Sequence, residues 1–377
     1  MTSKFDEIRP YTSADLPQVL QSLVNNPDLI NTLVAFRFAH WPAFTKPFIG
    51  ATIKWLISRR IKSINSLREF QSLVEPYMQR TINKSTSAFT ITGLDTLDLS
   101  KPCLFVSNHR DIALDPAFVN WALHLHQQNT VRIAVGDNLL TTQWIADLIR
   151  LNKCFVVKRS IEGRREKLNA AKLLSEYVHH SLHNDKSHIW IAQREGRAKD
   201  GIDLTNPAVL SMLTMNKPKS MAFGEYVEQL RIVPVSISYE YDPCDINKAK
   251  ELAVAEEHGS YSKPTDEDMR SIVAGITGQK GKVSIHFGRV IGAEFENTKD
   301  LAEHIDMQIL ANYQIFPTSH IAHSLLSKED KQTSKLRDEH KAAYNYLQTR
   351  LAELSTAQQD KLLHMYANPI IRMRNGQ

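Results

Sequence analysis

The stretch "CLFVSNHRDIALDPAF", residues 103–118, reads as a strand that runs through a polar turn into a helix. Its first residues are apolar, as in a buried strand, and Pro116 suits the first turn of a helix. Similar apolar runs recur along the chain, with helix-length segments between them. This alternation predicts a mixed, largely parallel α/β sheet flanked by helices.

The predicted elements divide the chain into three successive parts. Residues 14–82 read as helices that begin after a Ser13 cap, and the chain beyond about residue 297 reads as polar helices. Between them, the predicted helices span 116–126, 142–151, 162–182 and 207–215, and the predicted strands are "AFTITGL", "CLFVSN", "VRIAVG", "CFVVKR", "HIWIAQ", "RIVPVSISYEY" and "KVSIHFGRVI". Pro234 inside a strand predicts an edge, a bulge or a strand start. We therefore predict a helical N-terminal region (1–86), an α/β domain (87–296) and a helical C-terminal region (297–377).

Composition narrows the class of protein. A chain with 42% hydrophobic and 23% charged residues is typical of a globular protein. Its three cysteines are far apart and form no CxxC pair, which argues against disulfides and thiolate zinc sites and favours a reducing, cytoplasmic location. The N-terminus lacks the pattern of a secretory signal. The net charge of +5 favours anionic partners, but no nucleic-acid-binding motif accompanies it, so we expect no nucleic acid.

One segment suggests contact with a membrane surface. No uninterrupted apolar run reaches about 18 residues, so no spanning helix is expected. Residues 38–60, "FAHWPAFTKPFIGATIKWLISRR", combine aromatic side chains with basic flanks. This pattern suits a helix that lies in the membrane interface, and it equally suits a helix whose aromatic side chains pack into a core.

The turn after the strand at 103–107 is the first candidate site. A histidine can act as a general base when a carboxylate on its other ring nitrogen fixes its tautomer. His109 has two possible partners of this kind, Asp115 and Asp111. The alternative is that Asp115 caps the helix and His109 is an ordinary loop residue. A kinase HRD loop is excluded, since Pro116 stands where that loop has its asparagine and no glycine-rich loop or DFG accompanies it.

Two further loops offer cationic side chains at strand ends. In "CFVVKRS", Lys158 and Arg159 end a strand, where a guanidinium can recognise phosphate through two parallel hydrogen bonds. In "IWIAQREGRAKDG", Gly196 permits close backbone approach, and Arg197 and Lys199 add cations. A solvated charged loop is the alternative for each. The histidines at 179 and 183 lack an HExxH motif, so we expect no metal site.

Taken in order, these pieces resemble the glycerolipid acyltransferase family over about residues 87–295. The resemblance rests on "NHRDIALD", "NKCFVVKRS", "REGRAKDG" and "IVPVSISYEYDPCDINKAKEL". The sequence departs from the family pattern at three points. Five residues, not four, separate His109 from Asp115, and the Glu195-Gly196-Arg197 block is one residue short of the family's Glu-Gly-x-Arg. The family's glycine in the second block is also absent.

The resemblance implies an activity and roles for the candidate residues. His109, oriented by Asp115, would act as general base on a hydroxyl of glycerol 3-phosphate or 1-acylglycerol 3-phosphate. Acyl-CoA or acyl-carrier protein would be the co-substrate, with no cofactor and no metal. Lys158, Arg159, Gly196, Arg197 and Lys199 would bind the acceptor phosphate. The product lipid implies peripheral attachment to the cytoplasmic face of a membrane.

Two alternatives remain open from the sequence. The irregular histidine–aspartate spacing is compatible with an inactive, lipid- or phosphate-binding member of the family, and the same base could serve a hydrolase. The sequence also leaves open the acceptor, the donor and its chain length, the partner of His109, and the oligomeric state.

Overall fold

The strand predicted from "CLFVSN" is present as a buried strand in the computed structural model, which describes residues 4–38, 40–264 and 266–376. This strand, β2 (Leu104–Ser107), and its neighbour β6 (Ile232–Tyr239) are buried along their whole length. Near-continuous apolar sequence is what a strand covered on both faces requires.

The structure divides into two compact units. The first combines residues 1–79 with 132–173, and the second combines residues 80–131 with 174–377. The boundary therefore cuts twice through the predicted α/β domain, and the predicted three-part organisation stays a prediction.

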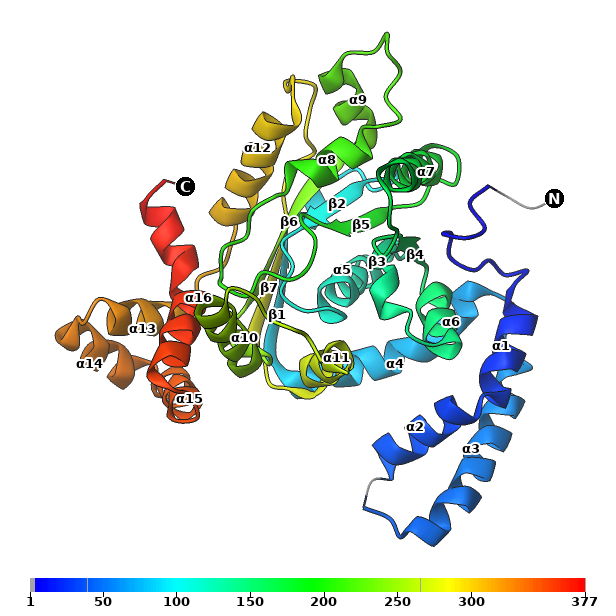
Figure 1. The fold of residues 1–377 in the computed structure, drawn as a ribbon, viewed down its shortest axis with the longest axis horizontal. Helices are drawn as coiled ribbons and strands as arrows, with labels where there is room; N and C mark the ends of the chain where they lie inside the picture. Colours follow the sequence, from blue (N-terminus) through cyan, green and yellow to red (C-terminus); the bar gives the residue numbers. More distant parts are fainter. Residues whose placement is uncertain (1–3, 39, 265, 377) are drawn as a thin grey trace. The chain divides into compact units, whose positions relative to one another are not determined.

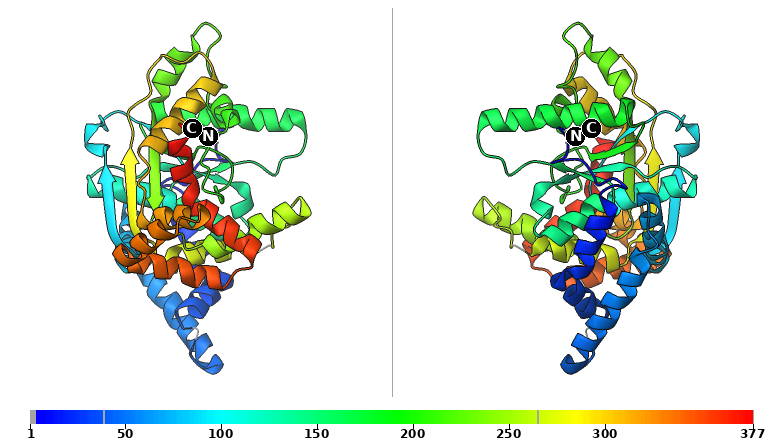
Figure 2. Two further views of the ribbon diagram at one scale, coloured as in Figure 1. Left: turned by 90° about the vertical axis from the view of Figure 1, so that its left-hand side faces the viewer. Right: turned by 90° about the vertical axis from the view of Figure 1, so that its right-hand side faces the viewer.

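The second unit contains five strands of a mixed, mostly parallel sheet, as the sequence predicts. Their order is β1-β7-β6-β2-β5, in which β6 and β7 run antiparallel and the other neighbours run parallel. Figure 2 shows β1, β7 and β6 side by side. The remaining strands of this unit are β1 (Thr86–Thr92), β5 (Ile189–Ala192) and β7 (Gly281–Phe287).

Helices of the second unit pack on this sheet and on one another. Helix α12 packs on β6 and α8, and Figure 1 shows α13, α14, α15 and α16 gathered on one side of the unit, next to α10. The helices are α5 (Leu114–Leu125), α8 (Pro207–Leu213), α9 (Phe223–Leu230), α10 (Asp245–His258), α11 (Glu267–Thr277), α12 (Thr298–Ala311), α13 (Pro317–Leu326), α14 (Asp330–Glu339), α15 (Lys341–Ala352) and α16 (Thr356–Arg374), with a 3-10 turn η2 (Leu94–Thr96).

The first unit is mainly helical and contains the parallel strand pair β3 (Arg132–Gly136) and β4 (Cys154–Val157). Its helices are α1 (Leu16–Asn25), α2 (Pro27–Arg37), α3 (Lys46–Ile61) and α6 (Gln143–Leu151), with 3-10 turns η1 (Ala43–Thr45) and η3 (Asp137–Leu139). Helices α4 (Leu67–Ser85) and α7 (Arg164–His183) run across the unit boundaries. Leucines of α1 pack with Leu151 of α6 in its apolar core. Within the described residues, no helix combines the length and the apolar character needed to cross a membrane.

Two details differ from the sequence predictions. Helix α1 is preceded by Asp15, not Ser13, because the Asp15 carboxylate accepts hydrogen bonds from Thr12 and Arg9 and fixes the turn there. Pro234 is the third residue of β6, which lies between β7 and β2 and is not an edge strand. The residues of β6 that pair with β7 run only from Val235 to Tyr239, so Pro234, which has no amide proton, falls outside that ladder.

Candidate active site

The turn after β2 is fixed by Asn108, whose side chain is fully buried. Its amide nitrogen donates to the Ile237 carbonyl at 2.9 Å, and its oxygen accepts from the Ile237 amide at 2.8 Å. The side chain thus continues the pairing with β6 for one step beyond the strand. His109 is the next residue, so its backbone position at the end of the sheet is fixed by these hydrogen bonds.

The His109 imidazole pairs with Asp115, not with Asp111. Its Nδ1 lies 2.8 Å from Oδ2 of Asp115, a carboxylate that is wholly inaccessible to solvent. Asp111 instead accepts hydrogen bonds from the amides of Ala113 and Leu114 and so starts helix α5. The alternative role of Asp115 as the helix cap is wrong, because Asp115 lies inside the first turn of α5.

The extra residue between His109 and Asp115 is accommodated by a turn that closes around the carboxylate. The amides of Arg110 and Asp111 both donate to Oδ2 of Asp115, at 2.6 and 2.9 Å. Backbone amides that point at a carboxylate stabilise its charged form. The five-residue spacing therefore still places the carboxylate on the imidazole.

Tyr239 at the end of β6 completes the environment of Asp115, and sequence analysis assigns it no role. Its hydroxyl donates to Oδ1 of Asp115 at 2.6 Å. Burial, together with the nearby carboxylate, raises the pKa of Tyr239 well above its usual value. The phenol therefore stays protonated and acts as a hydrogen-bond donor.

The other side of the imidazole is partly open. The His109 side chain keeps 14% of its surface accessible, and its ring packs edge-on against Trp190 with 5.6 Å between centroids. Nε2 makes no hydrogen bond to any part of the chain that the structure describes. A histidine held through Nδ1 with Nε2 unengaged has the arrangement of a general base.

The loop after β5 lies next to His109. The Ala198 amide donates to the His109 carbonyl at 2.9 Å. Gly196 is exposed with a φ of 72°, a backbone conformation that favours glycine. Arg197 Nη2 lies 3.4 Å from Ser271 Oγ, whereas its buried Nη1 has no hydrogen-bond partner within the described residues. Lys199 forms an ion pair with Glu251, which neutralises its charge.

Lys158 and Arg159 follow β4 in the first unit, whereas the five other predicted site residues belong to the second. Lys158 forms an ion pair with Glu7, and this contact lowers the pKa of Glu7. The amides of Arg159 and Ser160 donate to the Asp137 carboxylate. The structure thus brings His109, Asp115, Gly196, Arg197 and Lys199 into one unit and places Lys158 and Arg159 in the other.

The cysteines are spread over both units of the structure. Cys103, Cys154 and Cys244 are buried free thiols, and burial raises the pKa of each. No group of three or more histidine, cysteine, aspartate or glutamate side chains in the described part of the chain is arranged to hold a metal ion.

Comparison with known proteins places the site in a family context. Residues 88–238, which include His109, Asp115 and the loop after β5, match the acyltransferase family model. A solved structure, the 1-acyl-sn-glycerophosphate (LPA) acyltransferase PlsC from Thermotoga maritima, is similar at 12% identity with a TM-score of 0.39, over 78% of this chain and 94% of that one. A likeness that distant carries no argument here. The curated proteins contain no match.

Proposed function

Residues 88–238 match the acyltransferase family model, and on this premise we propose that the chain moves a fatty acyl group from acyl-CoA or acyl-carrier protein to a hydroxyl of glycerol 3-phosphate or 1-acylglycerol 3-phosphate. The observation that carries the proposal is the 2.8 Å contact between His109 Nδ1 and the buried Asp115 carboxylate. The reaction would belong to phospholipid biosynthesis.

The imidazole supplies the base. With its Nδ1 proton held by Asp115, His109 accepts the hydroxyl proton of the acceptor at Nε2 while the hydroxyl oxygen attacks the thioester carbonyl. The tetrahedral intermediate collapses, the C–S bond breaks, and the thiolate leaves with the proton returned by the imidazolium. Base catalysis of this kind contributes about 10²–10⁴ to the rate.

The cationic residues hold the acceptor phosphate in this proposal. Support comes from Arg197, whose buried Nη1 lacks a hydrogen-bond partner in the described chain and is available to an anion. Gly196 leaves the backbone open beside it, because a Cβ built there would meet no atom within 4 Å. Lys199 could serve only by exchanging its Glu251 partner for the phosphate. The phosphate-binding role of Lys158 and Arg159, which lie in the first unit, stays a prediction from the sequence.

Replacement of His109 with alanine tests the mechanism. Acyl transfer should fall at least ~10²-fold, because the proton acceptor is lost. Binding of glycerol 3-phosphate, measured by calorimetry, should change little. His258→Ala, at the exposed end of α10, is the matched control and should keep full activity. The mechanism is wrong if the His109 variant retains substantial transfer.

The assay separates this activity from the two alternatives. It follows the release of free thiol and identifies the acyl product with glycerol 3-phosphate and with 1-acylglycerol 3-phosphate as acceptors. Ester formation supports the transferase. Free fatty acid would identify a hydrolase, and absence of both products with intact phosphate binding would identify an inactive member.

We also propose that the protein attaches peripherally to the cytoplasmic face of a membrane through α3. Core packing, the alternative reading of this segment, is wrong for the aromatic residues Phe44, Phe48 and Trp55, which are 75%, 76% and 55% exposed. Phe44 lies in η1, just before α3, whereas Lys54, Arg59 and Arg60 lie on α3 with Phe48 and Trp55 and suit anionic headgroups. Ala39, within the predicted segment, lies outside the described residues.

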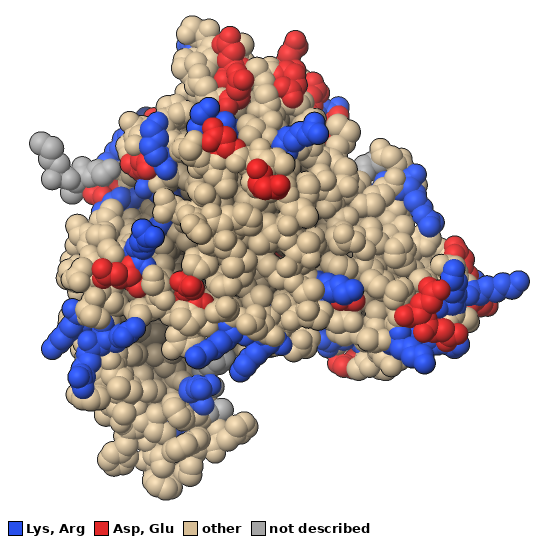
Figure 3. Space-filling model, turned by 180° about the vertical axis from the view of Figure 1, so that it is seen from behind, with Lys and Arg blue, Asp and Glu red and all other residues tan. Residues whose placement is uncertain are grey.

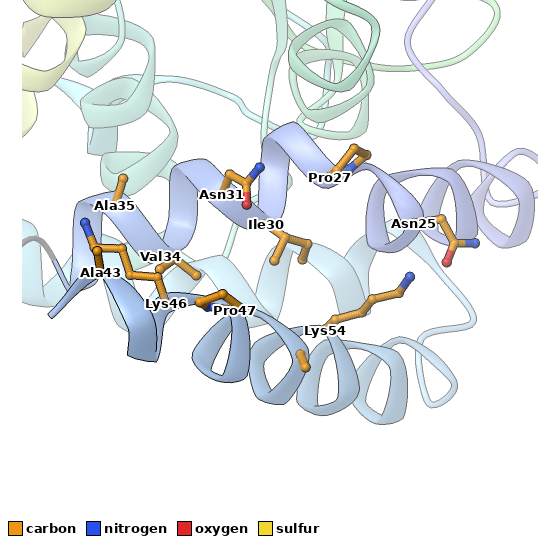
Figure 4. A pocket seen from close by; sticks show the side chains of 12 residues that line it. Asn25, Pro27, Ile30, Asn31, Val34, Ala35, Ala43, Lys46, Pro47 and Lys54 are labelled. Atoms are coloured by element: carbon orange, nitrogen blue, oxygen red, sulfur yellow. The ribbon is translucent and has the colours of Figure 1, made fainter. Parts of the chain in front are cut away.

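The surface around α3 supports this attachment. On the face drawn in Figure 3, the far end of the α2–α3 hairpin is mostly uncharged. A groove of about 580 Å³ lies between the two helices, and Figure 4 shows Ile30, Val34 and Pro47 along it, with Lys46 and Lys54 also on its lining. An apolar groove edged by lysines is compatible with acyl chains below an anionic headgroup layer.

A further inference from the structure

The C-terminal helix α16 contacts the loop that follows β5, although the helix lies outside residues 88–238. We call residues 194–203 the β5 loop; it contains Gly196, Arg197 and Lys199. The side-chain amide of Asn368 donates to the Asp200 carbonyl at 2.7 Å, and Nη1 of Arg372 donates to the Asp203 carbonyl at 2.7 Å. Arg372 is buried, so its contact is not a surface ion pair.

The β5 loop also approaches α16 where one hydrogen bond of the helix is missing. Pro369 lies inside α16 and has no amide proton, so the carbonyl of Met365, four residues earlier, loses its usual helical donor. The β5 loop meets this carbonyl at Gly201, where a Cβ would lie 2.2 Å from the Met365 oxygen. Gly201 also has a φ of 79°. Only a residue without a side chain at position 201 therefore lets the loop approach the Met365 carbonyl this closely.

The β5 loop in turn holds the turn that carries His109. Arg110 Nη2 donates to Oδ2 of Asp203 at 2.6 Å, and both side chains are buried. The Arg110 guanidinium also lies over the Tyr313 ring, 5.5 Å from its centroid. The amide of Arg110 donates to Oδ2 of Asp115, the same oxygen that pairs with the imidazole.

Helix α10 fixes the same residue from the other side. Nζ of the buried Lys248 donates to the Arg110 carbonyl at 2.8 Å and pairs with the Asp242 carboxylate. The amide of Asp242 donates to the hydroxyl of Tyr366 on α16 at 2.9 Å. Arg110 is thus bound through its side chain, its carbonyl and its amide, and two of these three connections lead back to α16.

From these contacts we propose that α16 is a positioning element of the active site and that Arg372 and Asn368 are its positioning residues. They touch no reacting atom. They act by holding the β5 loop, which holds Arg110 and so the pairing of His109 with Asp115. The inference rests on the proposed function for its catalytic consequence, but the structural linkage stands apart from it.

Hydrogen exchange on the full chain, read by mass spectrometry, tests the linkage without any need for activity. In Arg372→Ala, peptides that cover 106–115 and 194–203 should exchange at least ~10-fold faster, while β7 should be unchanged. Arg374→Ala is the matched control, because Arg374 is exposed on the same helix and its hydrogen bond is to His323, outside the β5 loop. Unchanged exchange in both loops, or equal acceleration in β7, would overturn the proposal.

Two further variants keep the test informative if Arg372→Ala folds poorly. Asn368→Leu removes the hydrogen bond to the Asp200 carbonyl, and exchange at 194–203 should still rise. Arg372→Lys keeps a donor near the Asp203 carbonyl and should restore slow exchange; failure to do so counts against the proposal.

Kinetics then measure the catalytic consequence. Since small displacements of catalytic groups can cost up to ~100-fold in rate, kcat of Arg372→Ala should fall ~10-fold or more with KM changed less than ~3-fold. A loosened loop with unchanged kcat would refute the positioning role. Absence of acyl transfer in the unmodified chain would refute the proposed function and leave the exchange result intact.

Discussion

The carboxylate of Asp115 receives four hydrogen bonds, from an imidazole, two backbone amides and a phenol. A buried charge is tolerated when its hydrogen-bonding capacity is used in this way. The same contacts leave the carboxylate one orientation only, so the imidazole that it holds is fixed as well. These contacts hold Asp115 against His109 although five residues, not the family's four, separate the two.

Tyr239→Phe should test how much the orientation of His109 contributes, because the variant keeps the imidazole but removes a hydrogen bond to its partner Asp115. Loss of a hydrogen bond to a buried charged group costs about 1.5–3 kcal/mol, so we expect a lower unfolding free energy and a ~10-fold lower kcat with KM nearly unchanged. Tyr261→Phe is the control, since that hydroxyl bonds only Glu267 near the surface among the described residues. Steady-state kinetics and urea unfolding provide the measurement. Equal kcat values for the two variants would argue against a role for Tyr239.

Two glycines of the β5 loop should respond differently to alanine. Both have positive φ, which costs about 1–2 kcal/mol for an L-residue. Gly196 faces open space, so Gly196→Ala should cost that amount only. At Gly201 the added Cβ would also collide with the Met365 carbonyl, so we expect Gly201→Ala to cost at least ~3 kcal/mol. Urea unfolding of both variants measures the difference; similar values would contradict it.

At the scale of elements, the strands and most helices could be predicted from sequence, because their core positions carry apolar residues at strand or helix spacing. Helices α9, α10 and α11 are not among the predictions. The buried face of α10 consists of Asp245, Lys248, Ala249 and Ala253, so it lacks the apolar periodicity that marks a helix. Asp245 and Lys248 make polar contacts that help to hold this helix, next to Ala249 in an apolar cluster, and a single sequence does not reveal the partners of these contacts.

The candidate site shows the same division. The pairing of His109 with Asp115 joins two residues of one strand–helix junction, so the sequence could suggest it. The contact of Tyr239 with Asp115 joins residues 124 positions apart, and only the fold brings them together. The ion pair of Lys199 with Glu251 is also non-local, since the two residues are 52 positions apart, so the sequence alone does not show that Lys199 has a partner.

The junction of α10, α15 and α16 should make stability depend on pH. Burial raises the pKa of Asp245 to about 6, although the nearby Arg350 opposes the shift. Between about pH 4 and 6 the folded chain thus holds a proton that the unfolded chain releases, and stability from this group falls as pH rises through that window. A shift of this size is worth on the order of 2–3 kcal/mol.

Asp245→Asn tests this dependence. The variant cannot ionise, so its unfolding free energy relative to the unmodified chain should increase between about pH 4 and 6 and then stay level. Urea unfolding at several pH values gives the difference. Asp360→Asn, at an exposed position of α16, serves as the control and should show no such trend. A flat difference for Asp245→Asn would contradict the prediction.

At the scale of the whole molecule, the net charge and the exposed aromatic side chains both favour the proposed contact with a membrane surface. The chain carries a net charge of +5, and α3 presents aromatic and basic side chains together. Electrostatic attraction would bring the chain to an anionic surface, and burial of aromatic area would hold it there.

Flotation with anionic vesicles tests membrane attachment. The double change Phe44→Ser and Phe48→Ser should reduce the bound fraction several-fold, because about 0.025 kcal/mol is lost for each Å² of apolar area no longer buried. Leu168→Ser, which changes an exposed apolar residue on α7, should leave binding unchanged. Raised salt should weaken binding of the unmodified chain. Equal flotation of all three proteins would eliminate α3 as the attachment site.

The first unit is assembled from two stretches of chain that are not consecutive, residues 1–79 and 132–173. Its apolar core joins leucines of α1 with Leu151 and Trp144 of α6. A protease that cut the backbone near residue 79 would therefore release no free fragment, because residues 1–79 would stay bound to residues 132–173 through this core. The nicked protein would run as two bands under denaturing conditions and as one species on a sizing column.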